Sequence, residues 1–284
     1  MLNQKRNRFP VFIIQIFQSE NEEMMNIHFY KYQGAGNDFI LIDHRMSTLK
    51  NIDNSLVKQL CDRRFGIGAD GLMFLLSHPS FDFEMVYYNA DGNVGSMCGN
   101  GGRCIVAFAK HLGIIDNETH FLAVDGEHYA KISAAGNWVD LQMINVQQIS
   151  KDGNAYVLNT GSPHYVLEVN ALETMDVYTA GKNIRNNDTY KAAGINVNFV
   201  EDQGDHLFVR TFERGVEDET YACGTGATAV ALAMAKHLHK SGHIETPVNV
   251  LGGRLHIKFD YDGQAFTHIF LGGPAEKVFE GDWG

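Results

Sequence analysis

A duplicated segment constrains the fold of this chain more than any other feature. Cys98 is followed by a glycine-rich run and an apolar stretch, and Cys223 is followed in the same way by Gly224-Thr225-Gly226 and a second apolar stretch. A glycine-rich turn before an apolar run predicts the beginning of a buried helix. A thiol there lies near the positive end of the helix dipole and free N–H groups, which favour the thiolate. Two such cysteines in matching contexts indicate a paired site.

The order of the predicted elements repeats around the two cysteines. Each half has two strands joined by a glycine turn, an amphipathic helix, further strands, the cysteine, a buried helix and more strands. The two buried helices would end alike, before Gly113 and Gly242. We expect helices at 53–62, 98–112, 172–182 and 223–238, and strands at 27–32, 38–43, 81–88, 121–124, 128–133, 138–143, 156–159, 164–169, 195–200, 207–212, 248–250, 254–260 and 265–271.

This repeat predicts an α+β fold with two pseudo-symmetric domains, each a mostly antiparallel β-sheet wrapped around a central helix. The first domain would comprise residues 25–142 with about 271–284, and the second residues 143–270. Residues 1–24 are interpreted as an N-terminal extension. Their basic start and short apolar region resemble a weak signal peptide, but no small-residue cleavage site follows.

Composition excludes several classes of partner. The chain has 284 residues and a formal net charge of −11, so a nucleic-acid backbone and an anionic membrane surface are not expected partners. No apolar run approaches the roughly 18 residues of a membrane span. The four cysteines, in a chain long enough to build its own core, favour free thiols and a cytoplasmic location. Of these, Cys61 and Cys104 are expected in the core.

Two opposed helix N-termini would bind an anion through backbone N–H groups. The donors would belong to Gly99 and Asn100 on one side and to Gly224 and Thr225 on the other. A carboxylate held there has its α-carbon between two sulfurs, so one thiolate could remove the α-proton while the opposite thiol returns one to the other face. Two readings compete with this one: buried structural thiols, and a disulfide between Cys98 and Cys223.

The chain resembles the diaminopimelate epimerase family over about residues 25–284. The motifs that carry the resemblance are Gly34-Ala35-Gly36-Asn37-Asp38-Phe39, Tyr88-Asn89-Ala90-Asp91-Gly92, Cys98-Gly99-Asn100-Gly101-Gly102-Arg103-Cys104, Pro163-His164, Asn196-Val197, Glu213-Arg214-Gly215, Cys223-Gly224-Thr225-Gly226 and Gly272-Gly273-Pro274-Ala275. The resemblance implies an isomerase of lysine and peptidoglycan precursor biosynthesis that converts LL- to meso-diaminopimelate without pyridoxal phosphate or metal.

The resemblance also assigns roles to residues. It implies that Cys98 and Cys223 are the acid–base pair and that His164 and Glu213 adjust the thiols. The substrate would be bound at its polar ends by Asn37, Asn89, Asn196, Glu213 and Arg214, and at the reacting carboxylate by the backbone of Gly99, Asn100, Gly224 and Thr225.

Two departures from the family pattern affect substrate contacts. Ser162 stands where many members carry Asn before Pro-His, and its hydroxyl reaches less far. Gly71 stands where some members carry Gln, so that side-chain contact is lost.

Other functions remain open on the sequence alone. A racemase or epimerase of proline or hydroxyproline would share the fold and the thiol pair, a related isomerase class lacks the pair, and a noncatalytic binding module would bind an amino acid without reaction. The expected partner is a small amino-acid substrate. A homodimer, and which cysteine is the base in which direction, are left open.

Overall fold

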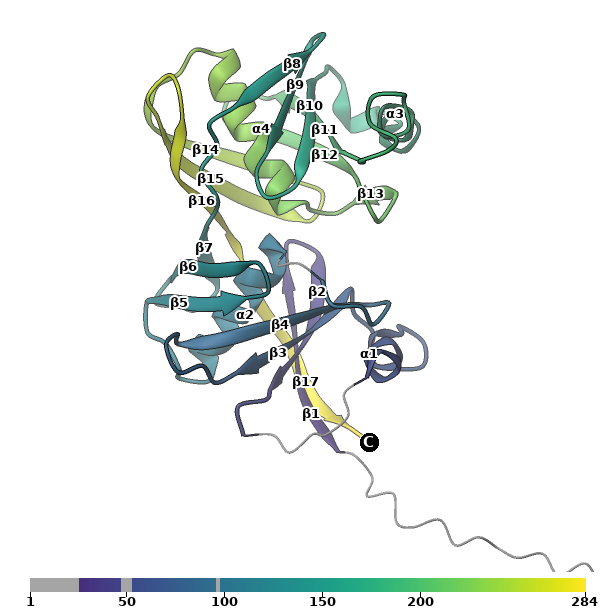
Figure 1. The fold of residues 1–284 in the computed structure, drawn as a ribbon, viewed down its shortest axis with the longest axis vertical. Helices are drawn as coiled ribbons and strands as arrows, with labels where there is room; N and C mark the ends of the chain where they lie inside the picture. The colour runs from purple at the N-terminus through teal and green to yellow at the C-terminus, as the bar shows by residue number, and fades with distance from the viewer. Residues whose placement is uncertain (1–25, 47–52, 96–97) are drawn as a thin grey trace, which may run out of the picture.

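The computed structural model describes residues 26–46, 53–95 and 98–284. The predictions for residues 1–24 lie outside the described residues. Two lobes make up the molecule, each with one long helix inside a β-sheet and a shorter helix on the outer side (Figure 1). The fold class is therefore the predicted one, an α+β fold built from two similar halves.

The two lobes contain the same kinds of element in the same order. The first lobe holds β1 (Ile27–Gly34), β2 (Asn37–Asp43), α1 (Asn54–Cys61), β3 (Gly71–Leu76), β4 (Phe83–Asn89), α2 (Gly99–His111), β5 (Glu118–Ala123), β6 (Gly126–Ile132), β7 (Trp138–Gln142) and the last strand, β17 (Glu276–Trp283). The second lobe holds β8 (Ile149–Asp152), β9 (Ala155–Asn159), β10 (Pro163–Glu168), the short 3-10 helix η1 (Leu172–Thr174), α3 (Val177–Arg185), β11 (Asn196–Asp202), β12 (Leu207–Glu213), β13 (Asp218–Thr220), α4 (Gly224–His237), β14 (Gly242–Val250), β15 (Gly253–Tyr261) and β16 (Phe266–Pro274).

Strand pairing repeats between the lobes. The parallel pair β2–β3 corresponds to β10–β11, and the parallel pair β4–β5 corresponds to β12–β14, while the other pairings are antiparallel. Strand β16 joins the lobes, because it pairs with β15 of the second lobe and with β7 of the first, and β17 then pairs with β1. This crossing places the start of β1 beside the end of the chain (Figure 1).

Each central helix lies in its own hydrophobic core. All residues of α2 from Gly99 to Ala109 are buried, and α4 is buried to the same depth from Gly226 to Ala235. The strands around them alternate buried and less buried positions, as β15 does from Leu255 to Tyr261. Helices α1 and α3 pack on the outer faces of the sheets, where Cys61 is buried as predicted, and Cys104 is buried in α2.

Two predicted helix limits are wrong. The helix expected at 172–182 is η1 followed by α3, because the Asp176 carboxylate accepts a hydrogen bond from the Thr179 N–H and starts a new helix. Gly242 begins β14 and does not end α4. The left-handed position after α4 is occupied by His239 (φ 52°), whereas Gly113 (φ 70°) occupies it after α2.

Strands β3, β8, β13 and β17 were not predicted from the sequence. Within the described ranges, no helix combines the length and the apolarity needed to span a membrane.

Candidate active site

The N-termini of α2 and α4 meet where the two lobes join. Cys98 and Cys223 are the N-cap residues of these helices, both with extended backbones. A Cβ added to Gly99 would lie 3.7 Å from the Gly224 Cα, and a Cβ on Gly224 would lie 3.6 Å from the Gly99 Cα. Either added carbon would also come within 2.8 Å of the Leu271 side chain. Glycine at the first helical position therefore allows the two helix ends to approach this closely.

Each sulfur has one polar neighbour on its own side of the junction. The Cys98 thiol lies 3.8 Å from the Asn37 Oδ1, and the Cys223 Sγ lies 3.5 Å from the Thr225 hydroxyl. All four cysteines of the chain are free. A sulfur thus stands at the start of each central helix, beside N–H groups of the first helical turn that have no carbonyl partner within the helix.

Burial governs the pKa of both thiols. Burial raises the pKa of Cys98, the Gly101 and Asn100 N–H groups and the Arg103 charge oppose that shift, and the Glu213 charge adds to it. Burial also raises the pKa of Cys223, with the Glu213 carboxylate as the next contribution. The helix N–H groups favour the thiolates, as the sequence predicts. Burial outweighs them, so the net effect is a raised pKa for both thiols.

Asn37 and Asn100 form one side of the site. The Asn100 amide is buried, and its Nδ2 donates to Asn37 Oδ1 at 3.3 Å and across the junction to the Ala222 carbonyl at 3.1 Å. Asn37 in turn donates to Asp70 Oδ2 at 2.5 Å. Asp70 and Asp38 are both paired with Arg63, so ion pairs hold Asn37 in place.

Three polar residues gather on the other side, in the second lobe. The Asn196 Nδ2 donates to Ser162 Oγ at 2.9 Å, and its Oδ1 accepts from the Arg214 backbone N–H at 2.9 Å. The Arg214 guanidinium lies 3.4 Å from Ser162 Oγ and is exposed. Ser162 therefore bridges the amide and the guanidinium that the resemblance assigns to the polar ends of the substrate.

His164 and Glu213 are buried or half-buried near this cluster. The His164 ring is fully buried, its Nδ1 accepts from Asn198 Nδ2 at 3.1 Å, and its Nε2 has no hydrogen-bond partner among the described residues. Burial lowers the pKa of His164 to about 3, so the ring is neutral with its proton on Nε2. The Glu213 carboxylate accepts from the Thr220 hydroxyl at 2.9 Å, and burial raises its pKa.

Asn89 and Gly71 lie opposite each other on β4 and β3. Asn89 is exposed at the end of its strand, and no hydrogen bond of its side chain occurs among the described contacts. A Cβ on Gly71 would lie 2.5 Å from the Tyr87 ring and 2.7 Å from the Tyr88 carbonyl oxygen. The packing of Tyr87 thus explains why this chain carries no side chain at position 71.

Sequence reasoning missed two buried polar residues beside the site. Asn198 holds the His164 ring and accepts from the Thr211 hydroxyl at 3.0 Å. Asn198 follows Asn196 by two positions in an otherwise apolar strand. This spacing puts both amides on one face of the strand, and it was the signal that could have identified Asn198. Arg103 bonds to Asn100 from inside α2. Apart from its charge, nothing in the sequence around Arg103 indicated that it lies beside the site.

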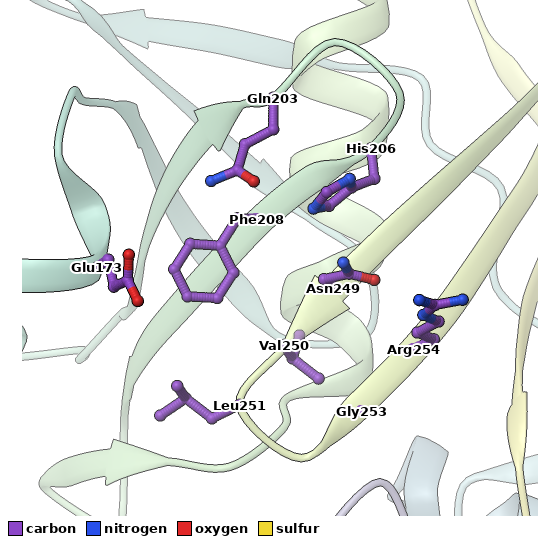
Figure 2. Close-up of a pocket in the computed structure, with 9 residues that line it drawn as sticks. All are labelled: Glu173, Gln203, His206, Phe208, Asn249, Val250, Leu251, Gly253 and Arg254. Atoms are coloured by element: carbon purple, nitrogen blue, oxygen red, sulfur yellow. The ribbon is translucent and has the colours of Figure 1, made fainter.

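One hollow in the second lobe lies away from these residues. It has a volume of about 490 Å³ and is bordered by β12 and the β14–β15 hairpin. Glu173 and Arg254 stand on opposite sides of it, and Phe208 lies between them (Figure 2). Its polar groups do not converge on one point, and it contains none of the candidate site residues.

Comparisons with known proteins agree with this geometry. A family model described as diaminopimelate epimerase matches residues 29–149 and 156–278, one match in each half. The chain is 53% identical to a diaminopimelate epimerase from Flavobacterium psychrophilum, covering 88% of this chain and 98% of the relative. It is 44% identical to one from Chlorobaculum tepidum, covering 87% and 98%.

Solved structures show the same fold at low sequence identity. A PhzF-family phenazine biosynthesis protein from Bacillus anthracis superposes with a TM-score of 0.71 at 14% identity, covering 92% of this chain and all of that protein. A hydroxyproline epimerase from Agrobacterium vitis gives a TM-score of 0.65 at 12% identity, covering 91% of both chains. Since the sequence matches extend through both lobes and include the two opposed cysteine turns, the chain belongs to the diaminopimelate epimerase family.

Proposed function

We propose that this chain interconverts LL- and meso-diaminopimelate by proton transfer between the substrate α-carbon and the Cys98 and Cys223 sulfurs. The observation that carries the proposal is the meeting of α2 and α4 at their N-termini, each with a cysteine as its N-cap residue. Membership of the diaminopimelate epimerase family supports it, and it places the enzyme in lysine and peptidoglycan precursor biosynthesis.

The reacting carboxylate would accept hydrogen bonds from the first N–H groups of both helices. These belong to Gly99 and Asn100 on one side and Gly224 and Thr225 on the other. The α-proton of an amino acid is very weakly acidic, so the negative charge that develops on the carboxylate must be stabilised. Preorganised donors of this kind contribute roughly 2.7–4 kcal/mol each in comparable oxyanion sites.

The proton transfer then proceeds between opposite faces of the α-carbon. A thiolate on one side takes the α-proton and becomes a thiol, while the C–H electron pair moves toward the carboxylate. The thiol on the other side gives its proton to the opposite face of the α-carbon and becomes the thiolate. The configuration is inverted, and a second turnover from the product runs in the reverse direction with the roles exchanged.

The distal end of the substrate would be bound by the cluster of Ser162, Asn196 and Arg214. The exposed Arg214 guanidinium can pair with a carboxylate through two parallel hydrogen bonds. A proline or hydroxyproline substrate has no second amino-acid end and would leave this cluster without a partner. Asn37 and Asn89 on the first lobe, together with Glu213 on the second, would complete the polar lining, with Glu213 and His164 adjusting the thiols.

Three expectations about the whole protein are part of the proposal. Residues 25–142 with about 271–284 form one domain and residues 143–270 the other. A cytoplasmic location suits the four free thiols. Light scattering on the purified protein would decide whether it acts as a homodimer.

Deuterium exchange tests the reaction directly. LL-diaminopimelate is incubated with the protein in D₂O, and the α-proton is followed by NMR. We expect exchange with inversion, and loss of more than about a thousandfold in the rate of epimerisation in Cys98→Ser and in Cys223→Ser, because each face then lacks its acid or base. Full activity in either variant contradicts the two-thiol mechanism. Exchange with proline and not with diaminopimelate would transfer the assignment to the alternative epimerase.

A further inference from the structure

Arg103 is a completely buried cation one turn into α2, with 0% of its surface exposed. Its Nη1 donates to the Gly99 carbonyl at 3.2 Å, its Nη2 to Asn100 Oδ1 at 3.0 Å, and its Nε to the Pro274 carbonyl at 3.4 Å. All three acceptors are neutral, and no carboxylate in the described part of the chain forms an ion pair with it. Arginine is almost never fully buried without an anionic partner, because removing its charge from water is costly.

The fold provides space for this guanidinium. A Cβ on Gly273 of β16 would lie 2.9 Å from Arg103 Nε and 3.0 Å from its Cζ. The strand that joins the two lobes therefore passes directly against the guanidinium, and a Cβ at this position would force the Arg103 or Leu255 side chain to shift. This contact accounts for one glycine of the Gly272-Gly273-Pro274-Ala275 motif, which the proposed reaction alone does not explain.

Arg103 connects to the Cys98 side of the site through two amides. It bonds to Asn100 Oδ1, and this bond turns the Asn100 Nδ2 toward Asn37 Oδ1. The same Asn37 oxygen lies 3.8 Å from the Cys98 sulfur. The charge of Arg103 also favours the thiolate of Cys98, and it opposes the effect of burial on the pKa of that thiol.

The second lobe has no cation at the corresponding position. Thr228 stands in α4 where Arg103 stands in α2, and it is also fully buried. Its hydroxyl donates to the Gly224 carbonyl at 3.0 Å, as Arg103 does to Gly99. The buried positive charge is thus confined to the Cys98 side, among the residues described.

The other charged or titratable groups near Cys98 do not supply this difference. Glu213 on β12 is anionic when ionised and disfavours both thiolates. Tyr87 on β4 and Cys104 on α2 have pKa values raised by burial, so both are neutral. The ion pairs of Lys31 and Arg63 with Asp38 and Asp70 lie below Asn37 and compensate one another. Of these charged groups, only Arg103 favours a charge on one sulfur over the other.

We propose that Arg103 is a positioning residue whose buried charge makes Cys98 ionise more readily than Cys223. This inference rests on the proposed two-thiol site and specifies it further: Cys98 is the thiol that becomes the base first, and Cys223 is the one that stays protonated. The same charge offsets part of the negative charge that a bound carboxylate brings to the junction of the helices.

Alkylation of the ligand-free, full-length protein tests the assignment. Iodoacetamide is added over a range of pH, and the modified Cys98 and Cys223 peptides are quantified separately by mass spectrometry. In the parent protein we expect Cys98 to be alkylated with its midpoint at lower pH than Cys223. In Arg103→Met the rate at Cys98 at pH 7 should fall about tenfold or more, because a nearby opposite charge shifts a thiol by one unit or more. Arg103→Lys should retain most of the rate.

Thr228→Val is the matched control, since it removes the hydroxyl at the corresponding position of α4 and should leave Cys98 alkylation unchanged. An unchanged Cys98 rate in folded Arg103→Met, or an equal loss in Arg103→Lys, overturns the proposal. If Arg103→Met does not fold, the parent protein alone tests the proposal. Alkylation of Cys223 with its midpoint at a lower pH than that of Cys98 also overturns it. Alkylation needs no substrate, so failure of deuterium exchange alone would refute the epimerase assignment and leave this one standing.

Discussion

Arg103 in the first lobe and Thr228 in the second occupy matching positions, and both bond back to the first carbonyl of their helix. The glycines at the helix starts match as well, and the two helix ends face each other across a close contact. The backbone is therefore repeated where a symmetric carboxylate would bind. The side chains differ, which fits the proposed reaction, because the remainder of an amino-acid substrate is not symmetric and one thiol would act as the base while the other acts as the acid.

A second difference between the lobes concerns how they touch. The β14–β15 turn of the second lobe packs on the β1–β2 turn of the first, where a Cβ on Gly252 would lie 1.8 Å from the Ala35 carbonyl oxygen. The Gly252 N–H donates to the Tyr221 carbonyl at 2.8 Å. The corresponding β5–β6 turn leaves Val124 66% exposed. The contact made by the β14–β15 turn therefore has no symmetric counterpart at the β5–β6 turn.

Asn100 and its counterpart Thr225 should differ most in their contribution to stability. Asn100→Ala leaves one guanidinium nitrogen of Arg103 without its acceptor and breaks the bond to Ala222. We expect it to lower the free energy of unfolding by about 3–4 kcal/mol, because a buried charged donor loses its partner. Thr225→Ala, which removes a hydroxyl near a sulfur, should cost less than about 1 kcal/mol. Urea unfolding measures both values, and similar losses would contradict the asymmetry.

The contact between the turns predicts an effect on activity. Gly252→Ala places a carbon against backbone atoms that cannot rotate away, so the lobes must separate at this edge. We expect kcat/KM for diaminopimelate to fall about a hundredfold, since small displacements of reacting groups have effects of this size. Asp125→Ala, in the corresponding turn of the first lobe, is the control and should retain full activity. Equal activity in the two variants would show that the contact has no part in positioning the site.

Most of the helical core could be predicted from the sequence, because its signals are local. A glycine-rich turn, a long apolar run and a terminal glycine define α2 within two residues. In contrast, β3 is a short, uniformly apolar run that pairs in parallel with β2, and its pattern does not distinguish a buried strand from a buried helix. The mostly exposed β17 is a strand because it pairs with β1 at the other end of the chain.

The site was predictable only in part for the same reason. The two cysteine turns can be found because they repeat in the sequence. Asn196 and Arg214 can be found because they stand next to recognisable turns. The bond from Asn100 to Ala222 joins residues from different lobes, and the space for Arg103 is supplied by Gly273 on the crossing strand. Contacts of this range depend on how the lobes pack, which no local pattern encodes.

Asp38 and His164 occupy matching positions, since each is the second residue of the strand after the first turn of its lobe. Lowering the pH should separate their contributions to the free energy of unfolding. Burial lowers the pKa of His164 to about 3, below its ordinary value of 6.5. The unfolded chain therefore binds a proton that the folded protein does not between these values, and stability falls as the pH drops through that range. From pH 7 to pH 5 the loss should be about 2 kcal/mol.

For Asp38, burial alone would raise the pKa, but hydrogen bonds from Arg63 and Lys31 lower it overall. Its contribution is present above its ordinary pKa of 3.8 and is lost only as the pH falls below that value. Chemical unfolding at pH 7 and pH 5 should show a loss about 2 kcal/mol larger in the parent than in His164→Gln. The same comparison with Asp38→Asn should show no such difference. A parent and a His164→Gln variant with equal losses would mean that the ring is already protonated in the folded state.

The smallest expected effect lies at the far ends of the central helices, where the lobes use different residues in the same left-handed conformation. Gly113 follows α2 at φ 70° and His239 follows α4 at φ 52°. The next N–H groups bond back in the same way, from Ile114 to Ala109 and from Lys240 to Ala235. Glycine adopts this conformation without the steric cost that a Cβ brings, so His239→Gly should stabilise the protein by about 0.5–1 kcal/mol and Gly113→Ala should destabilise it by a similar amount. Thermal unfolding would resolve opposite shifts of a few degrees, and shifts of the same sign would show that local contacts of His239 outweigh its backbone strain.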